Sequence, residues 1–321
     1  MKKPTFRLYV LVLSALLSGC MRDQPEAMQE IAIQGIYSAA LSESGAYAVI
    51  GSINHGGSLW QTSDMERRYN WNLKAGSYSN ISATALSGNG NIALTADTRQ
   101  AVFWNTRNGE SISYWSTPAD VKTAALSGNG SLAMFGLRDY SAIVVDVSTG
   151  NTLFRLSHQG MVGSVSISED GRIGLTGSDD SSAKLWDLSA GKMLHEWPHS
   201  NTVNLVKLSA DGSLAITSSQ HTGFYLWDVK SGKQNHFVAN RSHTITSAAF
   251  SEDNKQVLLG SSLQEIGLWE TGSAKRIKHW NIAGKNVWQP SNTKVYALAF
   301  SSQNKHFYSV TSNGVLQKWA L

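Results

Sequence analysis

Cysteine is almost missing from this chain, and the single cysteine is Cys20. With one thiol in 321 residues no disulfide bond can form within the chain, so packing alone must stabilise the fold. Charge is scarce as well, because only 16% of the residues are Asp, Glu, Lys or Arg, whereas 41% are hydrophobic. This composition is typical of a folded protein with a sizeable core.

A strong net charge is missing from most of the chain, although the sequence pI of about 9.0 suggests a basic protein. Lys2, Lys3 and Arg7 stand within the first nineteen residues, which contain no acidic residue. Without these three, 24 basic residues face 23 acidic residues. We therefore expect no general attraction to nucleic acid or to anionic membranes, and no nucleic-acid partner.

A long hydrophobic run is absent too. The apolar stretch Leu8–Leu17 has about ten residues, which is too short to span a bilayer as a helix. Because basic residues precede it, it is typical of a signal peptide. It leads into Leu-Ser-Gly-Cys at 17–20, which resembles the lipobox of bacterial lipoproteins. That resemblance implies that Cys20 becomes the lipidated first residue of the mature protein.

Three segments follow from this interpretation. We expect a signal peptide over 1–19, the lipidated cysteine with a short polar tether over 20–27, and a folded domain over 28–321. The residue after the cysteine is Met21 rather than Asp. In the lipoproteins that the lipobox resembles, this implies sorting to the bacterial outer membrane, with the domain on the periplasmic side.

One heptapeptide pattern recurs seven times. It consists of an apolar β-branched residue, four variable residues, then Leu, Ile or Phe, and finally Ser. A turn rich in Gly, Asn and Asp follows most copies, as a hairpin between two short strands requires. The final serines stand at positions 42, 87, 127, 168, 209, 251 and 301.

An aromatic anchor follows the final serine by 17 or 18 residues in six copies, and Val145 replaces it in the third. Most copies add a further apolar strand, and four of them carry a second Trp eleven residues past the anchor. Four short strands in a period of about 41 residues are typical of a propeller blade. The anchors are Trp60, Trp104, Trp186, Trp227, Trp269 and Trp319, and the second tryptophans are Trp71, Trp115, Trp197 and Trp280.

The Leu-Trp-Asp tripeptides at 185–187 and 226–228, and the histidines His158, His199 and His243 before the first strands, resemble the WD40 family. The resemblance implies an all-β, seven-bladed propeller with four-stranded antiparallel blades.

The two ends of the chain predict how the ring closes. The last copy ends at its third strand, 315–321, so the seventh blade lacks an outer strand. The segment at about 28–34 is the remaining strand-like stretch. We expect these two segments to pair, which removes two exposed sheet edges.

His158, Thr176 and Asp180 could be taken for a hydrolase triad. The resemblance to WD40 proteins favours a structural role instead, in which these three residues and Trp186 form a buried hydrogen-bonded tetrad. Such a chain stabilises a blade when every member is satisfied. Only the fourth copy carries the full set, so we expect its blade to be the most rigid.

The central channel offers little chemistry. Across the seven heptapeptides there is no Asp, Glu, His or Cys, and the only charged residues are Lys122 and Lys207. We therefore expect no carboxylate pair, general base or metal site in the channel. The remaining histidines lack metal-ligand spacing, so we expect no metal, no cofactor and no catalytic residues.

The resemblance implies that partners bind one face, the top face. It carries the loops that enter each first strand and the turns that join the second strand to the third. We expect the candidate partner-binding residues on its turns to be His55, Arg99, Arg138, Tyr140, Asp179 and His221.

The longest spacing between copies inserts a loop at 283–294. It contains Trp288, the one tryptophan outside the repeat pattern, beside Lys285, Asn286 and Gln289. A solvent-facing Trp among polar residues has the composition of an interface hot spot. The alternative is that Trp288 folds back onto the edge of the blade.

These observations favour a non-catalytic platform that binds other envelope proteins and is attached to the membrane by a lipid on Cys20. Two alternatives stay open. One is a propeller that binds a small ligand or a glycan, and the other is a hydrolase that uses top-face loop residues such as His55, Arg99, Arg138 and His221. Convergence of these four side chains in one pocket would distinguish the alternatives from the platform.

Overall fold

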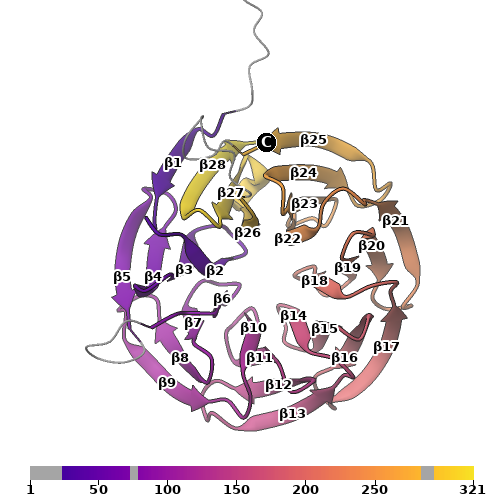
Figure 1. Cartoon of the computed structure of the whole chain (residues 1–321), viewed down its shortest axis with the longest axis horizontal. Coiled ribbons are helices and arrows are strands. Elements are labelled where there is room, and N and C mark those ends of the chain that lie inside the picture. Colours follow the sequence, from indigo (N-terminus) through magenta and orange to yellow (C-terminus); the bar gives the residue numbers. More distant parts are fainter. Residues whose placement is uncertain (1–23, 73–78, 283–292) are drawn as a thin grey trace, which may run out of the picture.

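The computed structural model describes residues 24–72, 79–282 and 293–321. Within these ranges the chain forms seven four-stranded antiparallel sheets, arranged as the blades of one closed ring, and contains no α-helix (Figure 1). The predicted all-β, seven-bladed propeller is confirmed. One short 3₁₀ turn, η1, covers Ser302–Asn304. No helix in the described ranges is long and apolar enough to cross a membrane.

Each blade takes its strands in chain order from the central opening to the rim. Blades 1 to 3 comprise β2 (Ile36–Leu41), β3 (Tyr47–Ser52), β4 (Gly56–Gln61), β5 (Glu66–Trp71); β6 (Ala83–Leu86), β7 (Ile92–Ala96), β8 (Gln100–Asn105), β9 (Ser111–Ser116); and β10 (Val121–Leu126), β11 (Leu132–Leu137), β12 (Ser141–Asp146), β13 (Thr152–Ser157). Blades 4 to 6 comprise β14 (Val162–Ile167), β15 (Ile173–Ser178), β16 (Ser182–Asp187), β17 (Lys192–Pro198); β18 (Val203–Leu208), β19 (Leu214–Ser219), β20 (Gly223–Asp228), β21 (Gln234–Ala239); and β22 (Ile245–Phe250), β23 (Gln256–Ser261), β24 (Glu265–Glu270), β25 (Arg276–Asn281).

Blade 7 contains both ends of the folded chain. Its strands are β26 (Val295–Phe300), β27 (His306–Thr311), β28 (Val315–Ala320) and, at the rim, β1 (Ala27–Glu30). β1 pairs with β28 in the register Ala27↔Lys318 to Glu30↔Val315. The predicted closure is therefore confirmed, but the N-terminal strand is shorter than the expected segment of about 28–34. It ends at Glu30 because the next two N–H groups both donate to the carbonyl of Gly314, so the chain turns there.

The final serine of the heptapeptide fixes the turn that follows it. In blade 4 the Ser168 hydroxyl donates to the Asp170 carboxylate, 2.7 Å away, and accepts the Ile173 N–H at 3.0 Å. Ser168 is fully buried, so both contacts satisfy a group that would otherwise be costly to bury. The same Ser–Asx pair recurs in blades 2, 3, 5 and 6, with Ser87, Ser127, Ser209 and Ser251. This explains why serine recurs at the end of the pattern.

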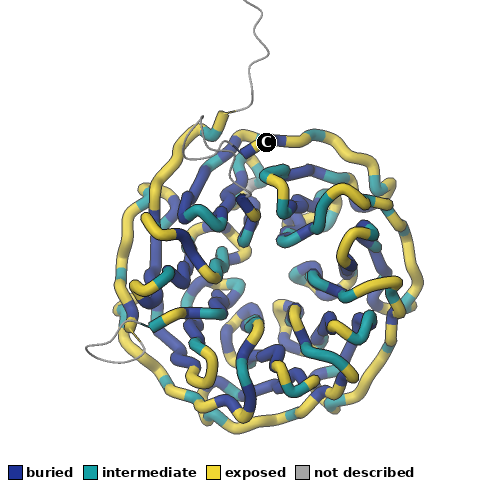
Figure 2. Tube along the Cα trace, in the orientation of Figure 1, coloured by how far each residue is buried: buried dark blue, intermediate teal, exposed yellow. Residues whose placement is uncertain are grey.

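The hydrophobic core is divided among the seven junctions between neighbouring blades. Each of seven separate clusters joins residues of two adjacent blades; the cluster around Phe103 and Phe135, for example, joins blades 2 and 3. Figure 2 shows the result, with buried inner strands and exposed rim strands. No blade can bury its own faces alone, so the ring is stable only as a whole.

Candidate partner-binding face

The polar cluster of blade 4 forms one continuous chain of hydrogen bonds. The Trp186 Nε1–H donates to Thr176 Oγ1 at 2.9 Å, and Thr176 Oγ1 lies 2.7 Å from His158 Nε2. His158 Nδ1 lies 2.9 Å from Asp180 Oδ2. A neutral imidazole with its proton on Nδ1 satisfies every contact, because Nε2 then accepts the Thr176 hydroxyl and Nδ1 donates to the carboxylate.

The pKa values of His158 and Asp180 favour this neutral histidine beside an ionised carboxylate. Burial lowers the pKa of His158, and this outweighs the hydrogen bond and the charge of Asp180, which act in the opposite direction. Burial would raise the pKa of Asp180, but hydrogen bonds from Gln159 N–H, Ser182 and His158 lower it to about 2. At neutral pH the pair is therefore a neutral histidine beside a carboxylate.

The hydroxyl groups of this hydrogen-bonded network are not accessible to a substrate. Thr176 and Ser178 are both fully buried, and the Thr176 hydroxyl is engaged by His158 and by Trp186. A nucleophile needs access to the reacting atom, which neither hydroxyl has in this arrangement. The geometry of the tetrad therefore supports its interpretation as a structural element of the blade.

Other blades retain parts of the same arrangement. In blade 5, His199 Nε2 and Trp227 Nε1 both lie 2.8 Å from Thr217 Oγ1, while His199 Nδ1 faces the Trp197 carbonyl at 2.9 Å. Among the described residues, two more blades keep the tryptophan-to-hydroxyl bond, as Trp104–Thr95 and Trp319–Ser309, while Trp60 donates to Ser58 on its own strand. The network is thus most extensive in blade 4.

The six turn residues predicted for the top face are all exposed and come from five different blades. They lie on the turns that join β3 to β4 (His55), β7 to β8 (Arg99), β11 to β12 (Arg138, Tyr140), β15 to β16 (Asp179) and β19 to β20 (His221). The ring therefore presents them on one face but does not gather them in one place. None of them lines either of the two cavities described in this structure.

The turn that carries Arg138 and Tyr140 is braced on several sides. Asp139 accepts the Ser141 hydroxyl at 2.7 Å and pairs with Arg155 at 2.6 Å. The Arg138 N–H donates to the Asp120 carbonyl at 3.0 Å, and the Tyr140 carbonyl accepts the His158 N–H at 2.8 Å. The turn is therefore held to its own blade and to both loops beside it.

Tyr140 occupies an unusual backbone conformation within this braced turn. Its φ of +68° lies in the left-handed region, which costs a tyrosine on the order of 1 kcal/mol. Its side chain is also among the large hydrophobic ones that stay in solvent, with 54% of the residue exposed. Beside it, the guanidinium of Arg138 has no ion-pair partner among the residues that the structure describes. Arg99, by contrast, is paired with Asp120.

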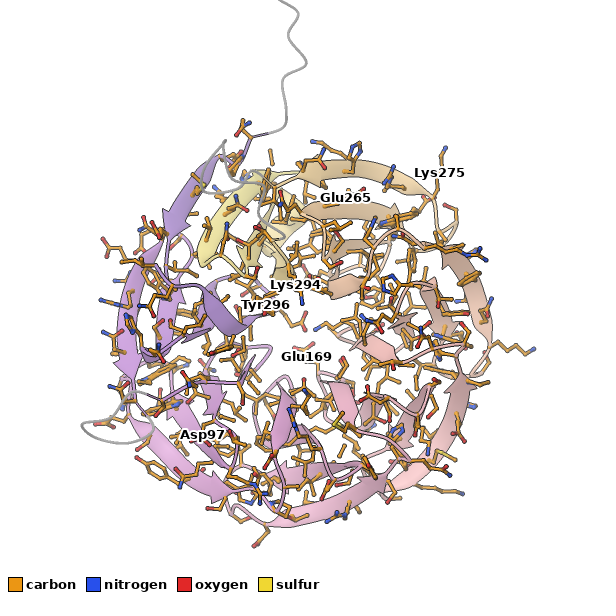
Figure 3. All side chains as sticks on the ribbon, in the orientation of Figure 1. Asp97, Glu169, Glu265, Lys275, Lys294 and Tyr296 are labelled. Atoms are coloured by element: carbon orange, nitrogen blue, oxygen red, sulfur yellow. The ribbon has the colours of Figure 1, made fainter. Side chains whose placement is uncertain are left out.

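The central channel contains charged groups from the turns as well as from the inner strands. A cavity of about 370 Å³ is lined by the inner strands of all seven blades, and Lys122 and Lys207 line it as expected. Two carboxylates line it as well, and both stand outside the seven heptapeptides, which contain no acidic residue. Glu43 and Glu169 reach it from the turns that follow β2 and β14, and Figure 3 shows Glu169 beside the central opening.

Glu43 forms an ion pair with a lysine of a distant blade. Its Oε1 lies 3.0 Å from the Nζ of Lys207, although the two residues are 164 positions apart in the sequence. The heptapeptide pattern could not indicate this pair. Glu43 stands just outside the pattern, and its blade faces the blade of Lys207 across the central opening. Within the described ranges, no three His, Cys, Asp or Glu residues form a group that could hold a metal ion.

Several predicted site residues lie outside the described residues. These are Cys20 and the loop residues Lys285, Asn286, Trp288 and Gln289.

Comparison with known proteins supports the fold. The family model described as "WD domain, G-beta repeat" matches residues 150–187, which include the first three strands of blade 4 and its complete tetrad. No curated protein matches the chain. Together, the local match and the seven-bladed ring support a WD40-like β-propeller.

Proposed function

We propose that this protein is a non-catalytic platform that binds other envelope proteins through the top face of its ring. A lipid on Cys20 holds it to the bacterial outer membrane, and the ring faces the periplasm. A WD40-like propeller is commonly an interaction scaffold, because its loops stand on a rigid frame. The proposal adds a specific surface and an anchor to that general role.

The observation that carries the proposal is the turn of Arg138 and Tyr140. An exposed tyrosine and an arginine without an ion-pair partner in the described ranges stand together on a braced turn. Tyrosine and arginine are the residue types that most often dominate the energy of protein interfaces. A turn that is already ordered loses little conformational entropy when a partner binds, so more of the contact energy becomes affinity.

Crosslinking in living cells tests the surface. A photo-crosslinking amino acid at Tyr140 should capture a distinct protein, which mass spectrometry then identifies. The matched control is the same amino acid at Lys230, an exposed residue in the turn between β20 and β21 on the opposite face. If both positions capture the same proteins, or if neither position captures any protein, the result would count against the top face as the binding surface.

Metabolic labelling tests the anchor independently. Cells that express the full chain should incorporate palmitate into it, and globomycin should block maturation of the labelled product. Replacing Cys20 with Ala should abolish the label, because the chain has no other thiol. An unlabelled wild-type chain would remove the lipid from the proposal and leave the binding surface untouched.

A further inference from the structure

A cavity of about 320 Å³ lies between blades 5 and 6. Its apolar lining comes from both blades, with Phe224 and Val238 on one side and Leu259 and Trp269 on the other. Polar groups of Asn240, Ser242, His243, Ser261, Glu265 and Arg276 form the rest of the lining. A cavity above about 300 Å³ that combines apolar walls with placed polar groups is typical of a small-ligand site.

The outer wall departs from the repeat at a position that four other blades fill with an indole. Trp71, Trp115, Trp197 and Trp280 hold equivalent registers on the outer strands, opposite the second residue of the third strand. In blade 5 that register belongs to Val238, opposite Phe224. At this junction no indole from the preceding blade reaches the next anchor.

At two other junctions such an indole lies flat on the anchor of the next blade. Trp71 stacks on Trp104 with 5.0 Å between ring centroids, and Trp197 stacks on Trp227 with 4.5 Å. Trp269 instead makes a T-shaped contact with Phe224, with 5.1 Å between ring centroids and an angle of 77°. The cavity thus lies where two other junctions hold a stacked indole.

The anchor tryptophan of blade 6, Trp269, also lacks the hydroxyl partner on the neighbouring strand that its counterparts in blades 4 and 5 have. Leu259 stands at the register of Thr176 and Thr217, so the strand offers no hydroxyl to Trp269. Gly267 follows at the register of Lys184 and Tyr225, and a Cβ atom there would lie 2.6 Å from the Trp269 Nε1. The indole therefore lies over the glycine, whereas Trp227 and Trp319 donate to a hydroxyl on the neighbouring strand.

The polar rim is already organised around Glu265, which Figure 3 shows within blade 6. Its Oε1 accepts a hydrogen bond from Arg276 at 2.7 Å, and its Oε2 lies 3.6 Å from the Nε2 of His243. Asn240 Nδ2 lies 2.8 Å from the same histidine nitrogen. The Arg276 guanidinium also lies 5.9 Å from the centre of the Trp269 ring.

We propose that this cavity binds an aromatic ring of about the size of an indole, stacked on Trp269 with an N–H or O–H edge directed to Glu265. The ring takes the place that Trp197 fills at the preceding junction. A free aromatic compound and an aromatic side chain of a bound protein share this chemistry. This site is separate from the turn of Arg138 and Tyr140.

Titration of the purified full chain with 5-fluoroindole, followed by ¹⁹F line width, tests the proposal. A fragment of this size should bind with a dissociation constant on the order of 1 mM. Val238→Trp restores the indole of the repeat and should weaken binding at least about tenfold, because the cavity is filled. Leu153→Trp, which adds an indole to an exposed position on β13, should leave binding unchanged. Thermal denaturation checks that both variants fold.

A crystal soaked with 5-bromoindole provides a test without any variant. Anomalous scattering should place the bromine in the cavity beside Trp269. Displacement of 5-fluoroindole by a tryptophan-containing peptide, but not by its alanine counterpart, would assign the site to a protein side chain. Failure of both peptides to displace it would assign it to a small compound. Equal binding by wild type and Val238→Trp, no binding, or a bromine elsewhere would overturn the proposal.

Discussion

At the scale of single residues, the hydroxyl of Thr176 connects Trp186 to His158 in the hydrogen-bonded tetrad of blade 4. It accepts from Trp186 and faces His158, so one buried oxygen satisfies two ring nitrogens. Sequence resemblance identified these residues because they stand at fixed distances from the repeat. It could not identify Glu43 with Lys207, or Glu265 with His243, because those pairs join residues whose spacing belongs to no repeat.

Replacing Thr176 with Val should therefore destabilise the protein strongly. The change keeps the shape but leaves two buried nitrogens without partners, at a cost of about 1–3 kcal/mol each. Urea denaturation should show a lower midpoint. Thr152→Val, an exposed position on β13, is the matched control and should change the free energy of unfolding by less than about 0.5 kcal/mol. Equal stability of the two variants would show that the hydrogen-bonded tetrad of blade 4 contributes nothing to the free energy of unfolding.

The buried histidines should make stability fall below neutral pH. Burial lowers the pKa of both His158 and His199 from the usual 6.5, so the unfolded chain binds these protons before the folded one does. Stability is thus fully present above about pH 6.5 and is lost as the pH falls, by at most about 1.4 kcal/mol per pH unit for His158. Denaturation at pH 5 to 8 measures this slope, and His158→Gln should make it shallower. A flat profile in the wild type would contradict the assignment.

The stabilising effect of the Asp180 carboxylate is lost at a lower pH than that of the histidines. Its pKa of about 2 lies below the ordinary value of 3.8, so its stabilising effect is present above that value and is lost between about pH 4 and pH 2. Asp180→Asn should remove this component while leaving most of the histidine-dependent slope. Loss of stability at equal rates in the variant and the wild type below pH 4 would show that other carboxylates dominate.

At the scale of elements, the pairing of β1 with β28 joins the two ends of the chain. The sequence predicted this pair because the last repeat was one strand short and one strand-like segment remained. It could not predict that β1 ends at Glu30, since this depends on two N–H groups that share the Gly314 carbonyl. The side chain of Glu26 adds contacts to Lys318 at 3.4 Å and His306 at 3.1 Å.

Deleting residues 315–321 should unfold the whole domain rather than one blade. The deletion removes β28, leaves β1 and β27 as unpaired edges, and opens two cores that depend on closure. Thermal denaturation and near-ultraviolet circular dichroism should show loss of all tertiary structure. Deletion of residues 21–23, which precede the closing strand, is the control. A truncated chain with an unchanged melting temperature would contradict the closure argument.

At the scale of the whole molecule, the period of about 41 residues was sufficient to predict seven blades and their order. What the repeat could not predict is where the junctions differ. The cavity between blades 5 and 6 arises because Val238, Leu259 and Gly267 change together, although they lie on three strands of two blades. Such departures from a repeat indicate functional sites when the surrounding frame is intact.

The affinity of top-face variants for the crosslinked partner tests the central claim most directly. Tyr140→Ala and Arg138→Ala should each weaken binding of the purified partner at least about tenfold, since hot-spot residues contribute this much or more. Leu153→Ala, an exposed apolar residue on the rim strand of the same blade, should leave affinity unchanged. All three variants should keep the wild-type melting temperature within a few degrees. Wild-type affinity in both turn variants would contradict a partner-binding role for the top face.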